Sequence, residues 1–422
     1  MSAAAFSPDE AFALALDAAD PLARSRDRFH LPLTPDGEPV VYFCGNSLGL
    51  QPKEARAIVE QELEAWARLG VGAHFEAPTP WYSYHEVFRE SGARLVGARP
   101  GEVVMMNSLT VNLHLMMVSF YRPTRERYRI LVEASAFPSD AYAVASHVRH
   151  HGLDPADALV IAAPRPGEAV VRTEDVEALL EKRGPEIALV LLGGVHYLTG
   201  QVLDMARIAA AARRQGCAVG FDLAHAAGNI PLRLHDWQVD FAVWCSYKYL
   251  NAGPGAVAGC FVHETHGKDK ALPRFAGWWG NDPETRFLMQ QEFVPREGAD
   301  GWQLSNPPIL ALAPLRASLA VFDEVGMAAL RAKSERLTGY LHDLIERIPG
   351  DRFRVMTPRE PAARGCQLSI GVRDARAVSR ALAARGMVVD VREPDIVRVA
   401  PVPLYNSFHE VWRFARILAT TG

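Results

Sequence analysis

Short apolar runs alternate with helical patterns between about residues 60 and 310. Seven runs have the length and continuous apolar character of buried strands, and they cover residues 103–106, 130–133, 159–162, 187–192, 218–222, 241–245 and 257–262. The segment 204–215 predicts a helix, because Asp204 can cap its start and Gly216 can end it. Buried strands separated by helices are typical of a sheet covered on both faces. We therefore expect an α/β fold with a mostly parallel, seven-stranded sheet.

The pattern changes from about residue 311 onward. Helical patterns over 310–325 and 327–347 precede short strands near 353–356, 368–372, 388–391 and 397–399, and a last amphipathic helix begins near Ser407. This mixture predicts a smaller α+β domain. Residues 53–69 predict another helix, which begins after Pro52 and stops at Gly70. We therefore expect an N-terminal segment with a helix (1–60) that packs on either domain, a large α/β domain (61–310) and a small α+β domain (311–422).

Composition and charge exclude several classes of partner. The chain has 422 residues, a formal net charge of −4 and no dense basic cluster, so neither nucleic acid nor an anionic membrane surface is expected to bind it. No run of about 18 apolar residues is present, and the N-terminus lacks the basic flank of an export signal. Five scattered cysteines without a C-x-x-C pair argue against a disulfide framework and a zinc site. We expect a cytoplasmic protein with a small-molecule substrate and no metal.

Two strands of the predicted sheet end at residues that carry chemistry. The run 218–222 ends at Asp222, and the run 241–245 continues into Ser246, Tyr247 and Lys248. Ligands of open α/β sheets bind at the carboxyl ends of the strands. A lysine and a carboxylate in one crevice suit pyridoxal phosphate, because the lysine holds the cofactor covalently and the carboxylate keeps its pyridine nitrogen protonated. Taken singly, Asp222 also fits a helix cap and Lys248 a solvated loop residue, so their joint placement carries the prediction.

A polar turn offers a site for the cofactor phosphate. Residues 107–110, with the sequence NSLT, join a predicted strand to an apolar helical stretch. The start of a helix presents free backbone N–H groups and a positive dipole end to an anion. A plain Ser or Thr N-cap is the alternative interpretation of the same four residues.

The chain resembles the kynureninase family in six stretches: SYKYLNAGPG (246–255), FDLAHAAGN (221–229), FPSD (137–140), YFCGNSLGLQP (42–52), NPPIL (306–310) and RVAPVPLYNSF (398–408). The resemblance runs from about residue 40 to the C-terminus, and the family has the fold type I architecture of aspartate aminotransferase. It implies a pyridoxal-phosphate-dependent homodimer with shared active sites. The implied reaction, part of tryptophan catabolism, is hydrolysis of L-kynurenine or 3-hydroxy-L-kynurenine to anthranilate or 3-hydroxyanthranilate and L-alanine.

The resemblance also implies roles for individual residues. Lys248, Asp222 and Tyr247 match the catalytic residues of the family, and Lys248 matches the lysine that holds the cofactor. Further cofactor contacts are implied for Leu109, Thr110, Phe137, Asp140, His225, Trp278 and Asn306. Trp278 and Asn306 match residues that reach the cofactor across the dimer interface. On the substrate side, Arg398 matches the arginine that binds the α-carboxylate, and Ser47, His74 and Asn306 match residues that line the site.

Several of these residues also have ordinary structural interpretations. Trp278 and Phe137 suit a core, His74 an exposed loop, and Arg398 a surface salt bridge. Only the family match favours a functional role for them. One departure from the family is visible at Gly193, where some relatives carry a hydroxyl residue, and it puts one hydrogen bond near the cofactor in doubt.

Three other functions are compatible with parts of the pattern. A cysteine desulfurase shares the fold and cofactor but needs a reactive cysteine, whereas the apolar neighbours of Cys366 predict a buried, inert thiol. An ordinary aminotransferase differs by consuming a keto acid. A non-catalytic binding protein is disfavoured because Lys248, Asp222 and Arg398 are all present.

Overall fold

The computed structural model describes residues 6–421, so residues 1–5 of the predicted N-terminal segment and residue 422 lie outside it. Its centre is a seven-stranded sheet with the order β2-β8-β7-β6-β5-β3-β4. The strands are β2 (Val103–Met105), β3 (Arg129–Glu133), β4 (Leu159–Ala162), β5 (Ile187–Gly193), β6 (Ala218–Asp222), β7 (Phe241–Trp244) and β8 (Gly259–Val262). Only β8 runs antiparallel to its neighbours. The predicted strands are therefore present, with ends shifted by two residues at most.

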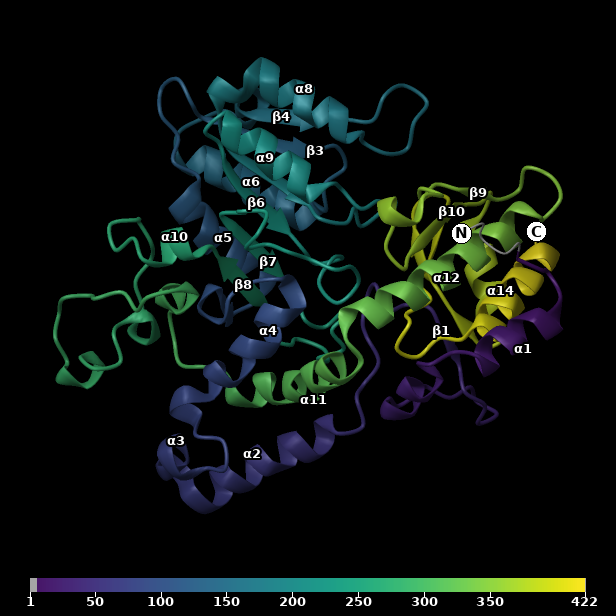
Figure 1. Ribbon diagram of the computed structural model, residues 1–422, viewed down its shortest axis with the longest axis horizontal. Coiled ribbons are helices and arrows are strands. Elements are labelled where there is room, and N and C mark those ends of the chain that lie inside the picture. The colour runs from purple at the N-terminus through teal and green to yellow at the C-terminus, as the bar shows by residue number, and fades with distance from the viewer. Residues whose placement is uncertain (1–5, 422) are drawn as a thin grey trace.

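Helices lie against both faces of this sheet (Figure 1). They are α4 (Arg89–Val96), α5 (Leu109–Phe120), α6 (Pro138–His150), α7 (Pro155–Ala158), α8 (Thr173–Arg183) and α9 (Met205–Arg214), while the short α10 (Glu264–Gly267) follows β8. The side chain of Asp204 accepts the backbone N–H of Arg207 at the start of α9, and Gly216 follows its end with φ +71°. Both ends of this helix thus form as the sequence predicts.

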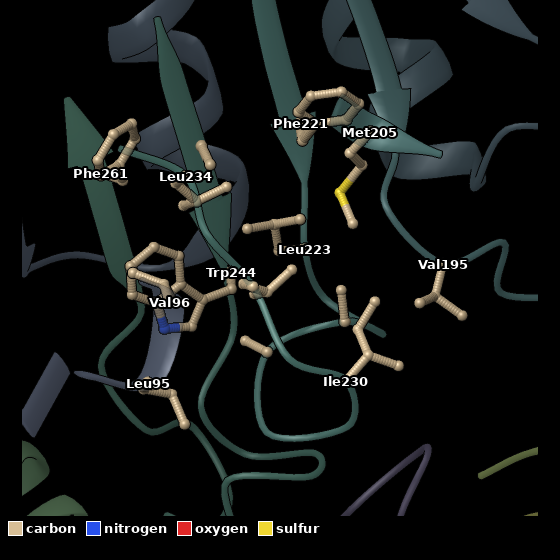
Figure 2. Close-up of a cluster of buried hydrophobic side chains, with 14 of the residues drawn as sticks. Leu95, Val96, Val195, Met205, Phe221, Leu223, Ile230, Leu234, Trp244 and Phe261 are labelled. Atoms are coloured by element: carbon tan, nitrogen blue, oxygen red, sulfur yellow. The ribbon is translucent and has the colours of Figure 1, made fainter. Parts of the chain in front are cut away.

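Alternate residues of the strands fill two separate apolar cores. In β7, Ala242 and Trp244 belong to one core, whereas Phe241 and Val243 belong to the other. Successive side chains of a strand point to opposite faces, so a strand buried on both sides must be apolar throughout. Figure 2 shows the first core, where Trp244 lies near Leu223 below the ends of the strands. This packing fixes the strand ends that carry the site.

The chain after residue 308 forms a second sheet with its own helices. Two long helices, α11 (Ile309–Val325) and α12 (Met327–Glu346), lead into an antiparallel sheet of order β12-β13-β10-β9. Its elements are β9 (Arg354–Val355), β10 (Leu368–Gly371), α13 (Ala375–Ala383), β12 (Asp390–Arg392), β13 (Ile396–Val399) and α14 (Phe408–Thr420). Ser407 and Glu410 form a capping box at the start of α14, where the sequence predicts that helix to begin.

The N-terminal residues contact the chain after residue 308, and the N–H of Gly49 also donates to the carbonyl oxygen of Tyr247 in the loop after β7, at 2.8 Å. Helix α1 (Glu10–Ala18) packs on α14, and β1 (Val41–Tyr42) pairs with β11 (Met387–Val388) (Figure 1). Helix α2 (Ala55–Leu69) instead packs on α11, and the short α3 (Ala73–Glu76) follows it. The predicted division at residues 60 and 310 stays a prediction. Within residues 6–421, no helix has both the length and the apolar character needed to cross a membrane.

Candidate active site

A cavity of about 170 Å³ lies at the carboxyl ends of β3, β5 and β6. Eight of the predicted site residues line it: Leu109, Thr110, Phe137, Asp140, Asp222, His225, Tyr247 and Lys248. Its remaining lining residues are Glu133, Ser139, Gly193, Val195, Tyr197 and Ala224. The structure therefore brings the predicted lysine and carboxylate into one cavity, together with the residues of the predicted phosphate turn.

Lys248 lies in the loop after β7 and points its amine into the cavity. Its Nζ is 3.1 Å from Nε2 of His225 and 5.8 Å from the ring centre of Phe137. Burial, and secondly the charge of Lys248, lower the pKa of His225 well below its ordinary value, so its imidazole is neutral. A neutral imidazole can accept a hydrogen bond from the lysine ammonium. A second loop packs closely here, because a Cβ at Gly49 would lie 2.3 Å from the Lys248 carbonyl oxygen.

Asp222 ends β6 with its carboxyl group buried against the cavity. Its Oδ1 accepts the backbone N–H of Ala224 at 2.6 Å. Burial, and next the charge of Asp222, raise the pKa of Asp140 to about 10, so Asp140 is protonated and donates a hydrogen bond to Asp222. Burial also raises the pKa of Asp222, whereas the Ala224 N–H and the Lys248 charge act to lower it. Asp140 therefore holds the proton of this pair, and Asp222 presents the negative charge to the cavity.

Two helices begin at the cavity. Helix α5 starts at Leu109 and α6 at Pro138, and the hydroxyl groups of Thr110 and Ser139 lie 2.9 Å apart between them. Ser108 precedes α5 without making a side-chain cap, so the plain N-cap interpretation of this turn does not describe it. The free N–H groups in the first turn of α5 and the two hydroxyl groups suit a phosphate. With a buried carboxylate, a lysine and an aromatic ring beside them, these groups fit pyridoxal phosphate.

Arg398 lies behind the cavity wall instead of lining it. Its side chain is 1% exposed, donates to the carbonyl oxygen of Tyr197 at 2.6 Å and forms an ion pair with Asp390. Burial lowers its pKa to about 10, so the guanidinium is charged at neutral pH. The surface salt bridge considered for Arg398 is therefore wrong, because this ion pair is buried.

Four other predicted residues lie outside the cavity of this chain. Ser47 and Asn306 are exposed, Trp278 is 44% exposed, and His74 is half-buried beside Trp81. The core interpretation of Trp278 is wrong, since its indole lies at the surface. Ser47, Trp278 and Asn306 are thus accessible at the surface of the chain.

Sequence reasoning missed five lining residues, whereas the sixth, Gly193, was already singled out as a position near the cofactor. Ser139 lies within the FPSD stretch, and Glu133 is a charged residue at the end of an apolar run, so both had a local signal. Val195, Tyr197 and Ala224 belong to loops whose course depends on the folded sheet. The thiol of Cys366 is fully buried and burial raises its pKa to about 12, as its apolar neighbours predict.

Comparison with known proteins gives a consistent result. A family model described as the kynureninase C-terminal domain matches residues 330–418. The kynureninase of Koribacter versatilis is 59% identical over 417 residues, which cover 99% of this chain and 98% of that protein. The kynureninase of Myxococcus xanthus is also 59% identical, over 98% of this chain and 97% of that protein. The resemblance seen in six stretches thus extends over nearly the whole chain.

Solved structures of lower identity share the architecture. The cysteine desulfurase of Thermococcus onnurineus is 18% identical with a TM-score of 0.77, covering 94% of this chain and 97% of that one. A C-DES mutant with glycine covalently linked to its pyridoxal-phosphate cofactor is 19% identical with a TM-score of 0.76, covering 91% and 97%. At these identities the likeness concerns the fold alone, and it confirms the predicted fold class.

Proposed function

This chain belongs to the kynureninase family, and on that premise we propose that the cavity around Lys248 is its active site, with L-kynurenine and 3-hydroxy-L-kynurenine as substrates. The reaction of the family is hydrolysis of the bond between Cβ and the carbonyl carbon of kynurenine, with pyridoxal phosphate as cofactor, and the chain is an enzyme of this type. The cysteine desulfurases are distant structural relatives only. The cytoplasmic location expected from the sequence is also part of this proposal.

The cofactor is proposed to be held by Lys248, Asp222 and Phe137, with its phosphate at the starts of α5 and α6. Bound pyridoxal phosphate supplies an electron sink for the bonds at the substrate α-carbon. The negative charge of Asp222 favours a protonated ring nitrogen, because opposite charges stabilise each other in a buried site. Phe137 is proposed to stack on the flat ring of the cofactor, because the lysine amine lies over the face of its ring, 5.8 Å from the ring centre.

Proton transfer is assigned to the lysine amine. Lys248 Nζ lies 3.1 Å from the neutral His225, so the amine has a partner whether or not it carries its extra proton. We assign to Lys248 the removal and return of the substrate α-proton. Burial raises the pKa of Tyr247 well above its ordinary value, so this phenol stays protonated and serves as a donor to the leaving alanyl carbon. One water is consumed, and its oxygen remains in the anthranilate carboxylate.

The observation that carries the proposal is the convergence of Lys248, His225 and Asp222 on one cavity. Incubation of the reconstituted enzyme with kynurenine and, separately, 3-hydroxykynurenine should release fluorescent anthranilates and alanine in equal amounts. Lys248→Ala should release neither product. The matched control Lys182→Ala replaces an exposed lysine of α8 and should release both products at the wild-type rate. Alanine formed without an anthranilate would exclude this function.

We further propose a homodimer in which Trp278 and Asn306 complete the partner's site. An aromatic patch of Phe75, Tyr82, Trp278 and Phe287 supports this, because neighbouring rings in it lie 5.7–5.8 Å apart and three of the four are 44–64% exposed. Exposed apolar patches of this kind mark interaction surfaces.

Mixed dimers test the shared site. Lys248→Ala and Asn306→Ala chains, each inactive alone, are unfolded together and reassociated. If Asn306 acts on the partner's site, hybrid dimers contain one intact site, and about a quarter of the wild-type activity returns. No recovery above the separate variants would show that Asn306 acts within its own chain.

A further inference from the structure

Three neighbouring strands end side by side at the wall of the cavity. In the sheet, β5 lies between β3 and β6, and Gly193 of β5 is paired with Asp222 of β6. Glu133 ends β3 on the other side of Gly193. The middle strand therefore ends in a residue without a side chain, between two strands that end in carboxyl groups.

The carboxyl group of Glu133 reaches over this gap. Both of its oxygens accept the backbone N–H of Gly193, at 3.1 and 2.9 Å, and its side chain lines the same cavity as Lys248. A Cβ at Gly193 would lie 2.9 Å from Oε1 of Glu133, closer than such atoms approach. A side chain at position 193 would therefore require the carboxyl group of Glu133 to shift.

Glu133 also forms part of a partition between two cavities. A second cavity of about 340 Å³ shares Glu133, Asp140, Gly193 and Asp222 with the first. Its remaining lining is mostly apolar and comes from β3, β4, β5, α6 and the loop 134–136. Loss of the Glu133 carboxyl group would therefore open the polar cavity toward an apolar one. Asp140 and Asp222 would lose the neighbour that bounds them on this side.

We propose that Glu133 is a positioning residue for the cofactor, supplying from β3 the polar side chain that the end of β5 lacks. The inference rests on the proposed function, since it assumes that this cavity holds pyridoxal phosphate. Burial, and secondly the charge of Asp222, raise the pKa of Glu133 to about 7, while the Gly193 N–H acts to lower it. The other titratable groups that line the same cavity as Glu133 and Asp222 are Asp140 on α6, His225, Tyr247 and Lys248.

The test measures cofactor affinity, not turnover. Cofactor-free full-length protein is titrated with pyridoxal phosphate, and binding is followed by quenching of tryptophan fluorescence and by the absorbance of the lysine-bound cofactor. Glu133→Ala should weaken binding about tenfold to a hundredfold, the range for loss of a hydrogen bond to a charged group. Glu133→Gln keeps an acceptor for the Gly193 N–H and should weaken binding less.

A double variant separates a positioning role from a structural one. Gly193→Ser alone should weaken binding, because its Cβ displaces Glu133. In Glu133→Ala combined with Gly193→Ser, the serine hydroxyl enters the vacated space, and binding should recover by at least threefold over Glu133→Ala. The matched control is Glu102→Gln, which changes a buried carboxyl group that pairs with His235 outside the cavity and should bind cofactor normally.

The outcomes are distinguishable. If the wild type itself fails to bind pyridoxal phosphate, the proposed function is wrong. If the wild type binds and Glu133→Ala binds equally well, this inference is overturned. It is also overturned if the loss of cofactor affinity in the double variant equals the sum of the losses in the two single variants and the melting temperature falls in parallel. Glu133 would then contribute only to the stability of the fold.

Discussion

Replacement of Asp390 by asparagine tests how the proposed carboxylate-binding arginine is oriented. Asp390 and Arg398 face each other in the register of β12 and β13, and the Nη2 atom of Arg398 donates to the Asp390 carboxylate. The Nη1 atom donates to the Tyr197 carbonyl oxygen, and Tyr197 lines the cavity. Two fixed partners thus hold the guanidinium plane while its other N–H groups stay available to a substrate carboxylate.

The magnitude follows from burial. Arg398 is 1% exposed and the Asp390 side chain 15%, and removing one partner of a buried ion pair costs about 3–5 kcal/mol. Asparagine keeps an acceptor oxygen, so we expect the lower end, about 3 kcal/mol, in the free energy of unfolding. Since the pKa of Arg398 is lowered to about 10, the arginine stays charged at pH 8 and can still bind a carboxylate. Loss of its orientation should raise KM about tenfold and change kcat much less.

Urea unfolding and initial rates of anthranilate release measure these two effects. Arg398→Lys should raise KM about a hundredfold, because an ammonium group cannot offer two parallel N–H donors to a carboxylate. Asp175→Asn, which breaks an exposed pair with Arg165, is the matched control and should leave KM unchanged. Wild-type stability and KM in Asp390→Asn would refute the orienting role, and wild-type KM in Arg398→Lys would refute the assignment of Arg398 itself.

Three further predictions concern single residues. Lys248→Ala should abolish product release and the absorbance of lysine-bound cofactor, and measurable turnover would contradict the assigned proton transfer. Cys366→Ser should keep kynurenine cleavage within about threefold of the wild type, because this buried thiol, with its pKa raised to about 12, takes no part in the reaction. In cofactor-free protein below pH 4.5, Glu133→Gln should have the same free energy of unfolding as the wild type. As pH rises toward 7 the wild type should lose stability relative to the variant, up to about 3 kcal/mol, because the raised pKa of Glu133 makes its ionisation costly in the folded state. Urea midpoints at pH 4.5 and 8 measure this difference, and equal midpoints for both proteins at pH 8 would contradict it.

The order of the main elements could be predicted because burial of a strand or helix face produces a local pattern of apolar residues in the sequence. Strands covered on both faces must be apolar throughout, as in β7, where Phe241 and Trp244 enter opposite cores. Asp222 and Lys248 were predictable as cavity residues for a related reason. Asp222 ends one buried strand and Lys248 follows the next, and parallel strands end at one edge of their sheet.

Features that depend on strand order could not be predicted in this way. The predicted strand at 388–391 is two strands, because the chain passes from β11, which pairs with β1, to β12, which pairs with β13. The ion pair of Asp390 and Arg398 depends on that register. The end of an apolar run marks Glu133 as a candidate, but its place in the cavity depends on β5 lying between β3 and β6, and the local sequence does not record that strand order.

The acidic wall of the cavity opposes folding, which indicates that it is built for the loaded state of the enzyme. Burial of three neighbouring carboxyl groups raises the pKa of each, and without a ligand Lys248 and the backbone N–H groups of Glu133, Gly193 and Ala224 offset part of this effect. A protonated pyridine nitrogen at Asp222 adds a positive charge where the pair of Asp140 and Asp222 has an excess of negative charge. Binding of the cofactor therefore offsets the destabilisation that the buried carboxyl groups cause in the cofactor-free protein, and the cofactor stabilises the native state by mass action. For that reason Glu133, a residue unfavourable to the empty protein, is best explained by the cofactor that its cavity is proposed to hold.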